Sequence, residues 1–149
     1  MDKVVLITGA ARGIGLATSH IFSNAGYQVL MLDRDKDALE KASSEVANSA
    51  ALDFDISVSG SSDAIAKLIS SQFGELNALI NNAGVAQFGP IEGCNSQTWR
   101  QVMDTNLDGM FYLSQSLTPL LRKSSGSIVN IASISGLRAS TLRVAYGTS

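Results

Sequence analysis

Two hydroxyl side chains near the end of the 149-residue sequence, those of Ser133 and Tyr146, could act together on a carbonyl group. Ser133 follows an apolar segment typical of a strand, and open α/β sheets bind their ligands at the carboxyl ends of strands. In such a site a serine holds the carbonyl oxygen, and a phenol passes a proton to it as a hydride reaches the carbon. Each residue also has a plainer interpretation, because serine is common in loops and an exposed tyrosine usually has no role.

Asn106 is a polar residue on an otherwise apolar helical face. Residues 97–122 have the period of an amphipathic helix, and at about 100° per residue Asn106 falls in the middle of its apolar stripe. The stripe consists of Trp99, Val102, Met103, Met110, Leu113, Leu117 and Leu120. A buried amide without partners costs roughly 1–3 kcal/mol, so Asn106 is predicted to be hydrogen-bonded. It is either part of a site or a structural amide that satisfies backbone where Gly109 loosens the helix.

The first residues of the chain predict a strand, a glycine turn and a helix. Residues 4–7 are consecutive apolar residues, typical of a strand buried on both faces of a parallel sheet. Gly9, Gly13 and Gly15 then allow a tight turn and the close approach of a pyrophosphate to the start of a helix. The buried side of that helix is predicted to be Ile14, Ala17, Ile21 and Ala25. Because the spacing is not the general G-x-G-x-x-G fingerprint, a turn that binds nothing stays an alternative.

Asp33 ends the second predicted strand, residues 28–33. A carboxylate at this place accepts hydrogen bonds from an adenosine ribose and repels a 2′-phosphate. The alternative is a loop acid or a helix cap. Arg12 and Arg34 could each meet a 2′-phosphate, so the sequence favours NAD without excluding NADP.

Predicted strands and helices alternate along the chain. The strands are residues 4–7, 28–33, 50–55, 76–80 and 127–131, and the later helices are 35–46, 61–73 and 97–122. This order implies βαβ units, so the predicted fold is α/β, a Rossmann-type doubly wound parallel sheet with helices on both faces. A complete fold of this kind has six strands. The sequence is therefore expected to form one dinucleotide-binding domain, residues 1–149, cut short after the fifth strand.

Composition excludes several classes of partner. The net charge is −2 and the basic residues are dispersed, so no nucleic-acid surface is predicted. No apolar run reaches the length of a membrane span or of a secretory signal. Cys94 is the single cysteine, and no Cys/His cluster indicates a metal site. A cytoplasmic globular protein without a metal is the expectation.

Five motifs, taken in order, resemble those of the short-chain dehydrogenase/reductase family. They are TGAARGIG (8–15), NNAG (81–84), Asn106 in the long helix, NIAS (130–133) and YGTS (146–149). The resemblance covers the chain from Lys3 to its last residue. It implies a Rossmann-type fold, a nicotinamide cofactor, and oxidation or reduction of a small alcohol or ketone. It also implies a homo-oligomer in the full-length form.

The resemblance assigns roles to individual residues. Ser133 would orient the substrate carbonyl, Tyr146 would be the acid/base, and Asn106 would hold a water in the proton relay. Asp55 and Ile56 would lie against the adenine. The full predicted cofactor-binding set is Gly9, Arg12, Gly13, Ile14, Gly15, Asp33, Arg34, Asp55, Ile56, Asn82, Ala83, Gly84 and Tyr146.

One departure from the family concerns its last motif, Y-x-x-x-K. The sequence ends at Ser149, one residue before that lysine, which in the family assists the tyrosine and holds the nicotinamide ribose. Little or no turnover is therefore expected of the sequence as given. The alternative function is a dinucleotide-binding or subunit-pairing module without catalysis.

Overall fold

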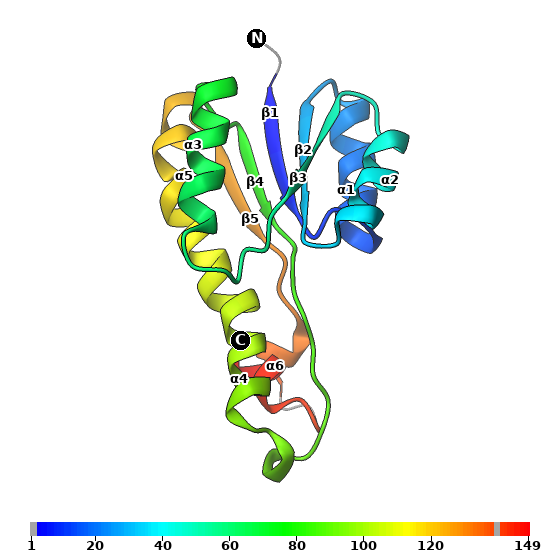
Figure 1. Cartoon of the computed structure of the whole chain (residues 1–149), viewed down its shortest axis with the longest axis vertical. Helices are drawn as coiled ribbons and strands as arrows, with labels where there is room; N and C mark the ends of the chain where they lie inside the picture. Colours follow the sequence, from blue (N-terminus) through cyan, green and yellow to red (C-terminus); the bar gives the residue numbers. More distant parts are fainter. Residues whose placement is uncertain (1–2, 139–140) are drawn as a thin grey trace.

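A five-stranded parallel sheet forms the centre of the computed structural model, which describes residues 3–138 and 141–149 (Figure 1). Its strands are β1 (Val4–Thr8), β2 (Gln28–Asp33), β3 (Ser49–Asp53), β4 (Ala78–Asn81) and β5 (Ser127–Asn130). The strand order is β3-β2-β1-β4-β5, with every pairing parallel. The chain therefore reverses its direction of travel across the sheet between β1 and β4, and open α/β sheets bind ligands beside such a point. The predicted Rossmann-type class is confirmed.

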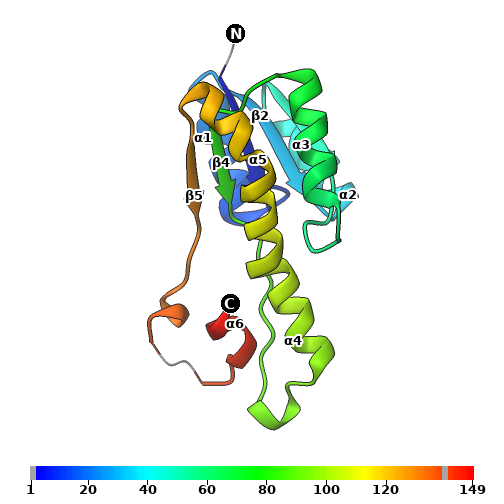
Figure 2. The same ribbon diagram turned by 90° about the vertical axis from the view of Figure 1, so that its left-hand side faces the viewer.

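Helices cover both faces of the sheet. In Figure 1, α1 (Gly13–Asn24) and α2 (Lys36–Glu45) lie on one side, and α3 (Ser61–Gln72) and α5 (Met110–Ser124) lie on the other. Beyond the carboxyl ends of the strands, α4 (Ser96–Met103) packs beside the short α6 (Val144–Thr148), as Figure 2 shows. Two 3-10 turns, Ile91–Gly93 and Ile134–Gly136, belong to the connecting loops.

The core is divided by the sheet into two apolar layers. Neighbouring residues of one strand point to opposite faces, so Leu6 packs toward α3 and α5 while Ile7 packs toward α2. Both side chains are fully buried. This two-sided burial explains why the opening strand is a continuous apolar run rather than an alternating one.

The buried side of α1 is not the predicted one. Ile14 and Ile21 are 62% and 67% exposed, and the helix buries Gly15, Ser19 and Ser23 instead. At the start of the helix the reason is distance, because a Cβ on Gly15 would lie 2.2 Å from the Gly9 carbonyl oxygen. The half-buried Leu16 and Phe22, rather than Ile14 and Ile21, supply the apolar contacts of α1 with the core. The Ser19 hydroxyl is satisfied within the helix, donating to the Gly15 carbonyl at 2.9 Å.

The predicted helix over 97–122 is continuous but not uniform. A π-helical segment, Asp104–Gly109, separates α4 from α5. Gly109 ends this segment and lies against the loop after β3, since a Cβ added to it would be 2.7 Å from the Ile56 carbonyl oxygen. The wide turn therefore holds the helix against the segment that contains Asp55 and Ile56.

No helix of the described residues is long and apolar enough to cross a membrane. In the same part of the chain, no group of three or more His, Cys, Asp or Glu side chains is arranged to hold a metal ion.

Two neighbouring residues after α5 are expected to respond oppositely to substitution. Ser125 has a φ of 54°, the left-handed conformation that glycine adopts most easily, so Ser125→Gly is expected to stabilise the fold by about 0.5–1 kcal/mol. Gly126→Ala is expected to destabilise it by more than that, because the added Cβ would lie 2.7 Å from the Asn77 carbonyl oxygen. Urea denaturation of both variants measures the two signs, and equal signs would contradict this account.

Candidate functional site

Thr8 and Asn82 join the carboxyl ends of β1 and β4. The buried Thr8 hydroxyl oxygen accepts hydrogen bonds from the backbone N–H groups of Asn82 and Ala83, at 3.0 and 2.9 Å. In return the Asn82 side-chain amide donates to the carbonyls of Thr8 and Gly9, at 3.0 and 3.2 Å. These reciprocal bonds fix the backbone where the sheet reverses its strand order.

The three glycines of the first turn are needed for different reasons. A Cβ on Gly15 would lie 2.2 Å from the Gly9 carbonyl oxygen, and one on Gly9 would lie 2.9 Å from the Ala83 Cα. Both positions are therefore closed by neighbouring backbone. Gly13 has open space around its Cα but a φ of 57°, which a residue with a side chain adopts only with strain.

The start of α1 has no side-chain cap, since no side chain bonds its first N–H groups in the part of the chain that the structure describes. Such N–H groups, with the positive end of the helix dipole, attract anions. The glycine turn is therefore suited to a phosphate.

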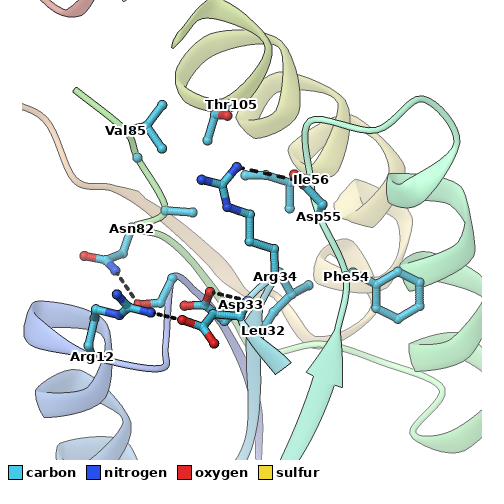
Figure 3. A pocket seen from close by; sticks show the side chains of 14 residues that line it. Arg12, Leu32, Asp33, Arg34, Phe54, Asp55, Ile56, Asn82, Val85 and Thr105 are labelled. Atoms are coloured by element: carbon cyan, nitrogen blue, oxygen red, sulfur yellow. Dashed lines mark hydrogen bonds and ion pairs between the residues drawn. The ribbon is translucent and has the colours of Figure 1, made fainter. Parts of the chain in front are cut away.

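A cavity of about 450 Å³ opens beside this turn, at the carboxyl ends of the strands (Figure 3). Its lining comes from the ends of β1, β2 and β4, the loop after β3 and the π-helical segment. The lining residues are Gly9, Arg12, Leu32, Asp33, Arg34, Asp35, Phe54, Asp55, Ile56, Asn82, Ala83, Gly84, Val85 and Thr105. In Figure 3 the ring of Phe54 points away from the other labelled side chains.

The carboxylate of Asp33 is held in place at the edge of the cavity. One of its oxygens accepts from the Ala11 N–H at 3.1 Å, and the other accepts from the Asp35 N–H at 3.1 Å. A carboxylate oxygen can accept more than one hydrogen bond, so Asp33 keeps acceptor capacity for a ligand hydroxyl. The site therefore presents an oriented negative charge at the end of β2.

Two ion pairs lie in the lining. Arg12 pairs with Asp35, and Arg34 extends from the end of β2 toward Asp55, with a nitrogen–oxygen distance of 3.7 Å (Figure 3). Burial alone would raise the pKa of Asp55. The hydrogen bonds from the Ser57 hydroxyl and N–H, together with the nearby Arg34, outweigh burial and lower the pKa of Asp55 below its ordinary value. Asp55 is therefore an anion at neutral pH.

Asn106 uses its side chain on the backbone of Val85. Its Oδ1 accepts from the Val85 N–H at 2.8 Å, and its Nδ2 donates to the Val85 carbonyl at 2.9 Å and to the Ser149 hydroxyl at 3.0 Å. The prediction that Asn106 is hydrogen-bonded agrees with these contacts. They tie the π-helical segment to the strand β4 exit and to the end of α6.

Ser133 and Tyr146 lie beyond the carboxyl ends of the strands, outside the cavity lining. The Ser133 hydroxyl accepts from the Ser135 N–H at 3.2 Å and so caps a 3-10 turn. Tyr146 is half-buried on α6, and its carbonyl accepts from the Ser149 hydroxyl at 3.0 Å. Ser149 thereby links Asn106 to the helix of Tyr146, whereas no hydrogen bond among the described residues joins Ser133 to Tyr146.

Most of the predicted cofactor residues meet in one place. The cavity is lined by nine of them, namely Gly9, Arg12, Asp33, Arg34, Asp55, Ile56, Asn82, Ala83 and Gly84. Gly13, Ile14, Gly15 and Tyr146 are outside its lining. Ile14 is largely exposed, and Gly15 is packed beneath Gly9.

The sequence alone assigned no role to several residues of this site, among them Thr8, Asp35, Val85 and Thr105. A threonine at the last position of a buried strand is a signal for the hydrogen bonds between Thr8 and the residues after β4. Thr105 is adjacent to Asn106, the polar residue in the helical stripe. Nothing in the sequence indicates that Asp35 pairs with Arg12, which lies far from it along the chain.

The short chain dehydrogenase family model matches residues 3–149. The chain belongs to this family. Among its relatives, galactitol 2-dehydrogenase of Agrobacterium fabrum is 32% identical over 97% of the chain and 58% of the relative. The 3-oxoacyl-[acyl-carrier-protein] reductase FabG of Staphylococcus aureus is 34% identical over 91% of the chain and 58% of that protein. The family expected from the motifs is thereby confirmed.

Two solved structures match this fold closely. NAD+-bound xylitol dehydrogenase superimposes with a TM-score of 0.90 at 30% identity, over 98% of the chain and 58% of that structure. A Burkholderia xenovorans protein assigned to the short-chain dehydrogenases/reductases superimposes with a TM-score of 0.91 at 27% identity. The match covers 98% of the present chain and 60% of the Burkholderia chain. The chain thus spans about three fifths of the length of the relatives and solved structures it matches.

Proposed function

We propose that this chain is the cofactor-binding part of an NAD-dependent short-chain oxidoreductase, which moves a hydride between a nicotinamide and an alcohol or ketone. The observation that carries the proposal is the cavity between the glycine turn and Asp33. Its lining contains Gly9 and Arg12, which lead into the uncapped start of α1 and suit a phosphate, together with the fixed carboxylate of Asp33, which suits ribose hydroxyls.

The charges of the lining support NAD rather than NADP. Three carboxylates (Asp33, Asp35 and Asp55) against two guanidinium groups (Arg12 and Arg34) give a formal charge of −1. A 2′-phosphate would add negative charge there, whereas the free ribose hydroxyl of NAD would not. The xylitol dehydrogenase of similar fold was solved with NAD+ bound, which agrees with this preference.

Ser133 and Tyr146 are proposed to act on the substrate oxygen, the first by holding it and the second by donating or accepting its proton. Asn106 is proposed to contribute through the backbone it holds at Val85 and through Ser149 on the Tyr146 helix. Asn82, Ala83 and Gly84 form the cavity wall where the adenosine half would lie. A homo-oligomer and a cytoplasmic location stay predictions.

Calorimetric titration of the 149-residue chain with NAD and with NADP tests the cofactor assignment. NAD is expected to bind with one site per chain, and Asp33→Asn is expected to weaken it about tenfold through loss of a charge-assisted hydrogen bond. Asp53→Asn is the matched control, since Asp53 ends β3 but is exposed and outside the cavity lining. A folded chain that binds neither dinucleotide would overturn the proposal.

A further inference from the structure

We propose, resting on the proposed function, that Asp35 sets the preference for NAD by holding Arg12 in an ion pair, so that Arg12 does not bind a 2′-phosphate. Asp35 is then a specificity-determining residue, although it need not touch NAD itself. Both side chains line the cavity that also contains the Asp33 carboxylate.

The contacts of Asp35 show how it can act on both Arg12 and Asp33. One carboxylate oxygen pairs with the Arg12 guanidinium, and the other accepts from the Ala38 N–H at 3.2 Å as the cap of α2. Its own N–H donates to Asp33 at 3.1 Å. Asp35 thus holds the Arg12 guanidinium through its carboxylate and orients Asp33, the proposed ribose acceptor, through its N–H.

The ion pair is accessible to solvent. The Arg12 and Asp35 side chains are 69% and 47% exposed, so breaking the pair exposes no uncompensated buried charge. Removing the Asp35 charge would leave Arg12 free beside the cavity and bring the formal charge of the lining from −1 to zero. A dianionic 2′-phosphate gains from both changes. The diphosphate is common to NAD and NADP, so any gain it makes is the same for both, and the ratio of the two Kd values reports the 2′-phosphate alone.

Asp35→Asn separates the charge from the structural role. Asparagine is as good a helix cap as aspartate, so the bond to Ala38 and the start of α2 are retained. Glu40→Gln is the matched control, because Glu40 lies on the same helix, pairs with Lys36 at 3.9 Å and is outside the cavity lining. It removes an equal charge from the chain without freeing Arg12.

Titration of NAD and NADP into the wild type, Asp35→Asn, Glu40→Gln and the double variant Arg12→Gln/Asp35→Asn tests the inference. Asp35→Asn is expected to lower the ratio of the NADP Kd to the NAD Kd about tenfold. The gain is expected to shrink at high salt, as exposed charges are screened. Glu40→Gln is expected to match the wild type, and the double variant to lose the gain.

An unchanged ratio of the two Kd values in Asp35→Asn, with NAD still binding, would overturn this inference alone. A gain of equal size in Glu40→Gln, or a gain that persists in the double variant, would also overturn it. If the folded wild type binds neither dinucleotide, the proposed function and this inference both fail.

Discussion

Gly15→Ala is expected to destabilise the fold by about 3 kcal/mol or more, because its new Cβ has no space. The Cβ would lie 2.2 Å from the Gly9 carbonyl oxygen and 2.7 Å from the Asn82 side-chain nitrogen. The Gly9 oxygen is backbone of the turn itself, and the Asn82 nitrogen donates to the Thr8 and Gly9 carbonyls and so joins the ends of β1 and β4. Relief of the clash must therefore move α1 away from the sheet, which should also abolish nucleotide binding. Urea denaturation and calorimetric titration measure the two effects.

Two other glycines provide the controls. Gly136→Ala is expected to be nearly neutral, since within the described ranges 3–138 and 141–149 no atom beyond its chain neighbours lies within 4 Å of the added Cβ. Gly13→Ala also meets no neighbour, but its φ of 57° is expected to cost about 1–2 kcal/mol. The expected loss of stability therefore decreases from Gly15→Ala to Gly13→Ala to Gly136→Ala. This order distinguishes the effect of a steric clash from that of backbone strain. A Gly15→Ala variant as stable as Gly136→Ala would show that the turn is not closed as described.

Thr8→Val is expected to destabilise the fold by about 2–4 kcal/mol, although valine has nearly the same shape as threonine. The change removes one hydroxyl oxygen that accepts from two backbone N–H groups, those of Asn82 and Ala83. Thr8 is 1% exposed, so water cannot readily replace the lost acceptor. The loss should be measured by urea denaturation, together with faster hydrogen exchange at these two amides.

Thr8→Ser is the matched variant, because it keeps the hydroxyl and loses only a methyl group. It is expected to retain the slow exchange of both amides and to lose only about 1 kcal/mol. If serine and valine at this position were equally destabilising, the packing of the methyl group rather than the hydroxyl would hold the strand ends together.

The strands and the order of elements could be predicted because the signals are local and mutually consistent. The apolar run of β1 is buried on both faces, and Asp33 ends β2 where the predicted strand ends. The β-branched and apolar residues of these strands have no competing period. Most of the predicted cofactor residues also meet at one cavity, since parallel strands bring their carboxyl ends to one edge of the sheet.

Features that depend on distances between segments could not be predicted. The apolar period of α1 indicated a side containing Ile14 and Ile21, but the close approach of Gly15 to the Gly9 carbonyl turns another side of the helix toward the sheet. The pair between Arg12 and Asp35 depends on how a turn and a second loop meet, which neither segment encodes alone. For Asn106 the sequence predicted a hydrogen-bonded amide, and only the fold could supply Val85 and Ser149 as its partners.

The π-helical segment has a consequence for how this part of the chain tolerates insertions and deletions. An α-helix turns about 100° per residue, so removing one residue from the wide turn would rotate everything before it relative to everything after it. In the structure α4 contacts α6, whereas α5 contacts α3 and β4. Asn106 lies in the π-helical segment between α4 and α5. The spacing of this segment is therefore constrained more tightly than its composition, and a length change here would misalign two helix faces at once.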